Sequence, residues 1–355
     1  MAVSRSRPRQ ALLLTVIAVA ACSGPGSGSG PAGSPPTAVT SSATRPSAPP
    51  VTIHEVAPDT ADPDVSGPSL ENLALVGSQA VWNGDLVVFL PGTGDQPSCC
   101  QLFLTEAADL GFHVIGLSYN NASAVATTCG NDLACYGVVH RNVFNGTEAS
   151  RYSDVPPEDG IEHRLAALLA YLEQTYPGEG WGRFLSGTVP RYASVVLAGH
   201  SQGGAEAAYI ATQRRVAGVV TLSAPPDTDN GLRPAIWLAG VRTGKTPVVR
   251  YYGFVHRDDL AGTRISADWQ AMGLAAFGPL TSVDGARAPY GGSHELVSAA
   301  ALPEPGAAAA HDGTAIDAMQ PLCPDGSPEY AAVWAYLLQA AAGLALTGPV
   351  SGCGA

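Results

Sequence analysis

The chain has very little lysine, since Lys245 is the only one in 355 residues. Lysine and arginine together number 18, against 30 aspartates and glutamates, and the formal net charge is −12 at pH 7. A chain so acidic offers no broad positive surface for nucleic acid or for anionic lipid headgroups. We therefore expect no nucleic acid partner and no electrostatic attachment to a membrane.

Long apolar runs and metal-binding motifs are also scarce. The one extended apolar run lies at residues 11–21, and it is shorter than the about 20 residues that span a bilayer. The spacings Cys-X-X-Cys and His-X-X-X-His do not occur in the sequence. We therefore expect neither a metal ion nor another cofactor.

The first residues resemble an export signal. Three arginines between residues 5 and 9 precede an apolar run that has the length of a signal peptide. The run ends in VAAC at residues 19–22, which resembles the lipobox of bacterial lipoproteins. By that resemblance residues 1–22 are a signal peptide with a lipobox, and Cys22 is lipidated to anchor an exported cell-envelope protein. The alternative is an ordinary signal, cleaved near Ala21, that gives a secreted protein.

The composition divides the rest of the chain into two parts. Residues 23–50 consist almost wholly of Gly, Pro, Ser, Thr and Ala, which cannot bury enough apolar surface to offset chain entropy. We predict that they form a disordered linker that holds the folded part away from a membrane. Residues 51–355 contain no second segment of this kind, and we expect them to form one large α/β domain.

Cysteine usage agrees with export. Six cysteines follow Cys22, and an even number in an exported chain predicts disulfides. Cys129 and Cys135 are placed to close a short loop. Cys323 and Cys353 are placed to tie down the C-terminal segment.

The most informative stretch is residues 193–212, which read ASVVLAGHSQGGAEAAYIAT. A short apolar strand, residues 195–198, leads into a Gly-X-Ser-X-Gly turn centred on Ser201, and a run of small residues typical of a packed helix follows. Glycines on both sides of the serine let the strand and helix backbones approach. In this context the pentapeptide indicates a nucleophile elbow, a sharp turn that exposes a reactive serine. The alternative is an ordinary glycine-rich turn between a strand and a helix.

Apolar runs and amphipathic segments alternate along the folded part. The alternation predicts a mostly parallel sheet with helices on both faces, whose ligands bind at the carboxyl ends of the strands. The predicted strands are residues 86–90, 113–117, 195–198, 216–222, 247–254 and 295–299. The predicted helices are residues 101–110, 161–175, 204–211, 267–275 and 329–341.

One long stretch breaks this regularity. Residues 119–160 are rich in Gly, Asn, Pro and Asp, and they leave the carboxyl end of a predicted strand. A long irregular stretch inside a compact domain is usually functional. We therefore expect an irregular insertion that lies over the site and shapes a pocket, the alternative being a surface loop without a role.

With these features in hand, the chain resembles the α/β-hydrolase superfamily of serine esterases and lipases over about residues 86–341. That resemblance implies a nucleophile, an acid and a histidine in this order along the chain. Asp258 and Asp259 follow the strand at residues 247–254 and are the candidates for the acid. We prefer Asp259, because a loop one residue longer turns a carboxylate back towards the histidine more easily.

Two histidines compete for the role of base. His311 lies in a segment beyond the last predicted strand, where the superfamily carries its base. His294 directly precedes the strand at residues 295–299, which places it at the amino end of a parallel sheet, away from the site. We therefore prefer His311, and the preference would reverse if residues 279–284 were the relevant strand.

The resemblance also implies an oxyanion hole made of backbone N–H groups. One donor is the residue after the nucleophile, Gln202. The other belongs to the loop after the strand at residues 86–90, where Thr93 is the first choice and Gly94 the alternative. Pro91 occupies the position at which the superfamily usually carries a histidine.

These residues together predict a serine hydrolase that cleaves carboxylic ester bonds through an acyl-enzyme on Ser201. The expected substrate is a small ester or an extracellular polymer. An acyltransferase or a thioesterase of the same fold is the alternative within this superfamily. A catalytically dead lipoprotein that uses the fold for binding at the cell surface is the alternative from another class.

Overall fold

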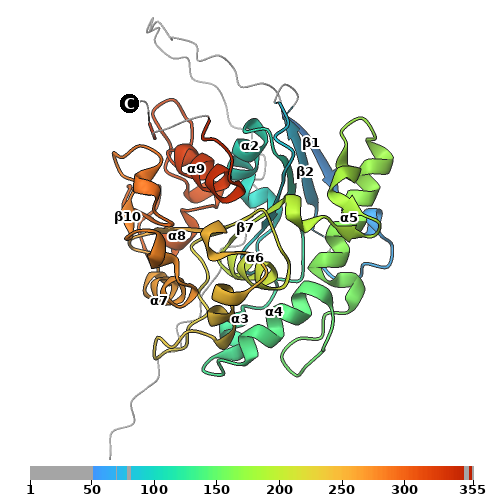
Figure 1. The fold of residues 1–355 in the computed structure, drawn as a ribbon, viewed down its shortest axis with the longest axis horizontal. Helices are drawn as coiled ribbons and strands as arrows, with labels where there is room; N and C mark the ends of the chain where they lie inside the picture. Colours follow the sequence, from blue (N-terminus) through green and yellow to red (C-terminus); the bar gives the residue numbers. More distant parts are fainter. Residues whose placement is uncertain (1–50, 69, 78–80, 348–351, 354–355) are drawn as a thin grey trace, which may run out of the picture.

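The computed structural model describes residues 51–68, 70–77, 81–347 and 352–353. The predicted signal peptide, the predicted linker and Cys22 lie outside these residues. The described chain is built on a nine-stranded sheet of order β1-β2-β4-β3-β7-β8-β9-β11-β10 (Figure 1). Strands β1 and β2 pair antiparallel with each other, β2 pairs antiparallel with β4, and every pair from β4 to β10 is parallel.

The central strands are buried along their whole length, as the continuous apolar runs in the sequence require. A separate two-stranded hairpin, β5 and β6, lies outside the large sheet. The strands are β1 (Val51–Val56), β2 (Asn72–Gly77), β3 (Leu86–Leu90), β4 (His113–Gly116), β5 (Leu185–Ser186), β6 (Val189–Pro190), β7 (Val195–His200), β8 (Gly218–Leu222), β9 (Tyr251–His256), β10 (Thr281–Ser282) and β11 (Glu295–Ser298).

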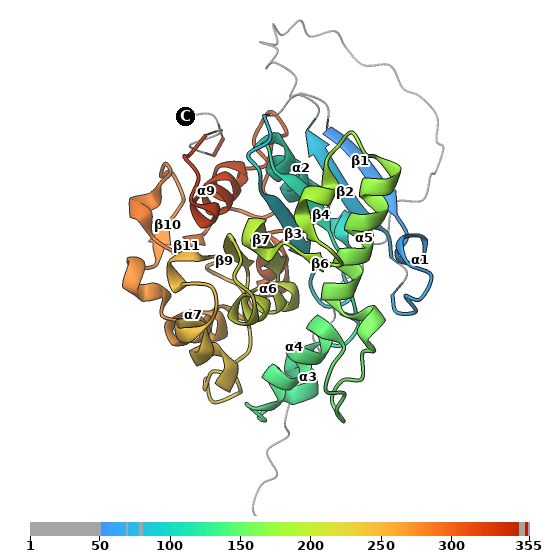
Figure 2. The same cartoon turned by 45° about the vertical axis from the view of Figure 1, so that its right-hand side comes forward.

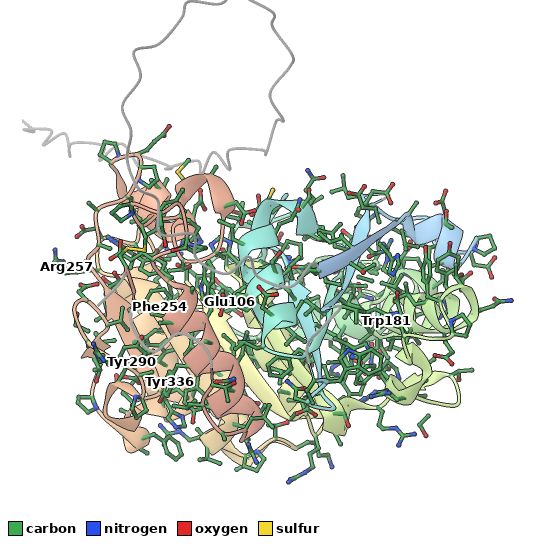
Figure 3. All side chains as sticks on the ribbon, turned by 90° about the horizontal axis from the view of Figure 1, so that it is seen from above. Glu106, Trp181, Phe254, Arg257, Tyr290 and Tyr336 are labelled. Carbon is green, nitrogen blue, oxygen red and sulfur yellow. A yellow bond between two sulfur atoms is a disulfide. The ribbon has the colours of Figure 1, made fainter. Side chains whose placement is uncertain are left out.

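Helices cover both faces of the sheet and enclose two apolar cores. Helices α4, α5, α6 and α7 bury side chains in one core, and α2 and α9 bury theirs in the other (Figures 1 and 2). Trp181 belongs to the first core and Tyr290 to the second, and they lie at opposite ends of the molecule in Figure 3. The helices are α1 (Pro58–Ala61), α2 (Gln101–Asp109), α3 (Val125–Cys129), α4 (Cys135–Asn145), α5 (Ile161–Thr175), α6 (Gln202–Gln213), α7 (Gly262–Met272), α8 (Ala307–Asp312) and α9 (Ala331–Ala342).

The predicted fold class is confirmed, and two predicted boundaries are wrong by four residues or more. Pro247 opens a 3-10 turn over Val248–Arg250, so β9 begins only at Tyr251. Helix α7 begins at Gly262, earlier than the predicted residue 267, because Ile265 and Trp269 share a buried helical face. Both shifts leave the segment that carries Asp258 and Asp259 between β9 and α7.

The expectation of irregular backbone at residues 119–160 is wrong in part. This stretch contains α3 and α4, which lie side by side (Figure 2). Their buried side chains, among them Tyr136 and Phe144, join the core beneath α5 and α6. Glycine and asparagine hid the helices in the sequence, although Gly130 and Gly146 only mark where each helix ends.

Both predicted disulfides are present. Cys129 and Cys135 join the end of α3 to the start of α4, and Cys323 is bonded to Cys353. Such bonds persist in oxidising compartments, which agrees with export. Within the described ranges no helix is long and apolar enough to cross a membrane.

Candidate active site

Ser201 lies in the sharp turn between β7 and α6, near the middle of the sheet (Figure 1). Its backbone has φ 51° and ψ −119°, a strained conformation for a residue with a side chain. Its N–H donates a hydrogen bond to the carbonyl oxygen of Leu222 at 3.0 Å, which joins the turn to the neighbouring strand. The turn therefore holds the serine hydroxyl at the carboxyl edge of the sheet.

Two glycines make this turn possible, as the sequence pattern indicated. A Cβ atom at Gly199 would lie 2.4 Å from the carbonyl carbon and oxygen of Gly203. A Cβ atom at Gly203 would lie 2.0 Å from the carbonyl oxygen of Leu90 on β3. Both distances are far inside van der Waals contact, so only glycine lets β7, α6 and β3 meet here.

The structure brings Asp259 and His311 to Ser201. Nε2 of His311 lies 2.8 Å from Oγ of Ser201, and Nδ1 of His311 lies 2.9 and 3.1 Å from the two carboxylate oxygens of Asp259. Because a carboxylate only accepts, Nδ1–H donates to Asp259 and Nε2 is left to accept the serine proton. Asp259 follows β9, and His311 lies in the last turn of α8.

The surroundings shift the pKa values of Asp259 and His311 in opposite directions. Burial alone would raise the pKa of Asp259, but the charge and hydrogen bond of His311 and the N–H of Ala261 hold it below its usual value. Burial alone would lower the pKa of His311, but Asp259, Asp312 and Asp95 raise it above its usual value. The Asp259 carboxylate therefore stays anionic beside the imidazole of His311.

The structure does not bring the two alternative residues to the serine. The side chain of Asp258 is 68% exposed, and its backbone N–H donates to Nδ1 of His256. His294 lies at the start of β11, donates from Nδ1 to the carbonyl oxygen of Tyr251, and is stacked between two aromatic rings. Burial lowers the pKa of His294 to about 4. It is therefore a neutral core residue at the opposite edge of the sheet.

The loop after β3 lies against the elbow. Oγ1 of Thr93 donates to Oε1 of Gln202 at 2.7 Å, which joins the two residues predicted to form the oxyanion hole. Their backbone N–H groups have no hydrogen-bond acceptor within the described part of the chain. The N–H of Gly94, the alternative donor, is occupied by the carbonyl oxygen of Asn121 at 3.0 Å.

Asn121 is a residue that sequence reasoning missed. Its Nδ2 donates to the carbonyl oxygens of Gly92 and Asp95 at 2.6 and 2.9 Å, so a single buried amide fixes the shape of the loop that carries Thr93. No motif marks this asparagine. Its place in the segment that follows β4, at the same edge of the sheet as Ser201, is the only signal that the sequence offered.

A cavity of about 860 Å³ opens over Ser201. Small apolar side chains from the start of the 119–160 stretch, from α8 and from the loop after β9 make up much of its wall, with four charged side chains among them. The apolar residues are Ala122, Ala124, Val125, Ala126, Leu260, Ala261, Ala307 and Ala308, and the charged ones are Asp95, Asp227, Arg264 and Asp312. In the described part of the chain, no cluster of His, Cys, Asp or Glu is arranged to hold a metal ion.

Comparison with known proteins gives only distant likenesses. No protein-family model matches the sequence, and no curated protein matches it. Among solved structures, a dienelactone hydrolase from Anabaena variabilis is 13% identical over 70% of this chain and 86% of that chain, with a TM-score of 0.36. A bacterial heroin esterase is 14% identical over 70% of this chain and 74% of its own, with a TM-score of 0.36. A hormone-sensitive lipase from a metagenome library is 14% identical over 72% and 77%, again with a TM-score of 0.36.

These values carry no argument about activity. The mostly parallel sheet, the strand–serine–helix turn at its centre and the helices on both faces are those of the α/β-hydrolase fold. What the protein does must be argued from the site itself, because this fold hosts many chemistries.

A first prediction concerns the close contact at the elbow. We expect Gly203→Ala to lower the free energy of unfolding by about 3 kcal/mol, because the clash is with backbone that cannot rotate away. Gly178→Ala is the matched control, since a Cβ atom there meets nothing within 4 Å. Denaturant unfolding measures both, and equal stabilities would contradict the contact described here.

A second prediction separates the two neighbouring carboxylates. Asp259→Asn should lower kcat by about 10⁴-fold, because an amide at this position no longer selects the imidazole tautomer that accepts from serine. Asp258→Asn makes the same chemical change one residue away at an exposed side chain and should leave kcat within about twofold. Steady-state kinetics on a chromogenic ester gives the answer, and the reverse order of effects would exclude Asp259 as the acid.

Proposed function

We propose that the protein is a serine hydrolase that cleaves carboxylic ester bonds through an acyl-enzyme on Ser201. The observation that carries the proposal is the unbroken chain of hydrogen bonds from Asp259 through His311 to the serine hydroxyl. A serine hydroxyl is a weak nucleophile at neutral pH and needs such a base beside it. The geometry supports His311 as this base and Asp259 as the carboxylate that orients it.

The proposed reaction has two halves. In the first, Oγ of Ser201 attacks the ester carbonyl carbon while Nε2 of His311 takes the serine proton. The tetrahedral intermediate then collapses, the protonated His311 gives its proton to the leaving alcohol, and the acyl group remains on Ser201. In the second half His311 activates a water molecule, which attacks the acyl-enzyme and releases the acid.

The oxyanion of each intermediate needs donors that are already in place. We propose the backbone N–H groups of Gln202 and Thr93 for this role, since both are free of other acceptors in the described part of the chain. The N-terminal end of α6 adds its partial positive charge at the same place. Loss of one such donor costs on the order of 3 kcal/mol in the transition state.

The cavity and the disulfides support a proposal about the substrate and its location. The walls of small apolar side chains suit an acyl or alcohol part of modest size. Two disulfides favour an oxidising compartment, so we propose an exported enzyme that acts on an external ester. Anchoring through Cys22 is proposed on its lipobox-like sequence alone.

A third prediction tests the nucleophile. A fluorophosphonate probe should label the wild-type protein and should not label Ser201→Ala, because the probe phosphonylates an activated serine. Gel fluorescence after labelling measures this directly. Absence of labelling in the wild type would contradict an active serine site, and labelling of both proteins would place the nucleophile elsewhere.

A fourth prediction tests the base. His311→Ala should lower kcat on p-nitrophenyl esters by about 10⁴-fold or more, because the serine proton then has no acceptor. His294→Gln is the comparison, a histidine change outside the cavity, and it should keep kcat within a few-fold even where it lowers the melting temperature. Turnover that survives in His311→Ala and disappears in a folded His294→Gln would reverse the assignment.

A panel of substrates that includes thioesters and alcohol acceptors shows whether hydrolysis or acyl transfer dominates.

A further inference from the structure

The loop that carries Thr93 is held through its backbone carbonyl groups on one side, and it faces β7 on the other. Asn121 binds two of its carbonyl oxygens, and the N–H of Asp95 donates to the carbonyl oxygen of Gly92 at 3.2 Å. The carboxyl group of Asp95 is buried and points towards His200 in the elbow, since a Cβ atom at Gly92 would lie 2.9 Å from both Oδ2 of Asp95 and Nδ1 of His200. In the described part of the chain this carboxyl group accepts no hydrogen bond.

The group that faces Asp95 is the imidazole of His200, the residue before the nucleophile. Its Nε2 lies 3.0 Å from the carbonyl oxygen of His311, so Nε2 carries the proton and donates it. Burial lowers the pKa of His200 to about 3, and the ring is neutral. Its Nδ1 therefore bears a lone pair, is buried, and has no partner in the described chain. Oδ2 of Asp95 lies 3.9 Å from this Nδ1.

An ionised Asp95 and the lone pair on Nδ1 of His200 are both hydrogen-bond acceptors, and they repel each other in a buried place. A protonated Asp95 would instead donate a hydrogen bond to Nδ1. The contact is not an ion pair, because His200 is neutral. Burial and the charge of Asp312 raise the pKa of Asp95 to about 7, with His311 acting in the opposite direction. A protonated Asp95 therefore forms readily at neutral pH and supplies the donor that Nδ1 of His200 lacks.

We propose that Asp95 is a positioning residue that acts as a neutral acid, donating from Oδ2–H to Nδ1 of His200 and holding the loop of Thr93 against the elbow. The inference rests on the proposed function, since it concerns the loop that would bind the oxyanion. The present separation exceeds a hydrogen bond by roughly 1 Å. Contacts of this kind are often long in ligand-free sites and tighten when substrate is bound.

This role links Asp95 to the base. The active form needs a protonated Asp95 together with a neutral His311, and each negative carboxylate near His311 makes that neutral form harder to reach. The activity should therefore rise and then fall over a narrow range of pH. Because Asp95 and His311 are coupled, the acid limb and the alkaline limb report the pKa values of the pair and not those of either residue alone. The titratable groups near Asp95 are His200 on β7, His311 and Asp312 on α8, Tyr119 beyond β4, and Cys100 at the start of α2.

The experiment compares pH profiles of kcat for the wild type, Asp95→Asn and Asp95→Ala. An amide donates to Nδ1 of His200 at every pH, so Asp95→Asn should keep most of the maximal kcat and lose the alkaline limb. Its acid limb should stay close to that of the wild type, because the protonated Asp95 of the active form carries no charge and the amide carries none either. Asp95→Ala should lower kcat by about tenfold to a hundredfold with little change in KM, since the loop is then held less firmly.

Asp85→Asn is the matched control. Asp85 immediately precedes β3, at the opposite end of the strand from Asp95, and burial raises its pKa to about 6. A purely structural role would lower the melting temperature of Asp95→Asn and leave its pH profile like those of the wild type and Asp85→Asn. That result, or an Asp95→Asn variant as slow as Asp95→Ala, would overturn the proposal.

A second measurement does not depend on turnover. Carbon-13 NMR of aspartate carboxyl groups in the wild type, assigned by comparison with Asp95→Asn, should show a carboxyl that titrates near pH 7. Titration of Asp95 near pH 4 would overturn the proposal even if Ser201 is the nucleophile. Loss of Ser201-dependent labelling in the wild type would instead reject the proposed function, so the two failures are distinguishable.

Discussion

The close contact of β7, α6 and β3 at Gly199 and Gly203 is the constraint on which the site depends. Backbone atoms meet there at distances that no side chain permits, and the chain reverses at Ser201 with positive φ. The same contact puts the first N–H of α6 and the loop after β3 on one side of the serine hydroxyl. The proposed nucleophile and the proposed oxyanion donors are therefore positioned by one packing contact in the middle of the sheet, rather than by separate loops.

Two buried carboxyl groups near the serine have pKa values that shift in opposite directions because their partners differ. Asp259 accepts hydrogen bonds from His311 and from a backbone N–H, and these hold its pKa below the usual value despite burial. Burial and the charge of Asp312 raise the pKa of Asp95, which faces the lone pair of a neutral imidazole. Environments that drive apart the pKa values of like groups are a common way to obtain an acid and a base at one pH. The proposed neutral Asp95 extends this principle to the oxyanion loop.

Much of this arrangement could be predicted from the sequence, because it follows from periodicity and from the ends of strands. The buried runs at β3 and β7 identified a parallel sheet, and the position of His294 before β11 argued for His311 as the residue near the serine. The antiparallel strands β1 and β2, the helices α3 and α4, and the contacts of Asn121 and Asp95 could not be predicted. The strand pairings and the side-chain contacts depend on segments that meet only in the folded chain. The two helices were missed because glycine or asparagine at a helix end resembles a loop when it is read locally.

The central claim is that Ser201 forms a covalent bond to the acyl group during turnover. Intact-protein and peptide mass spectrometry of the protein, quenched with acid within the first turnovers of a p-nitrophenyl ester, tests this most directly. We expect an added mass of one acyl group on the peptide that contains Ser201, together with a burst of p-nitrophenol, and neither in Ser201→Ala. Steady turnover without any acylated peptide, or an acyl group on a different residue, would contradict it.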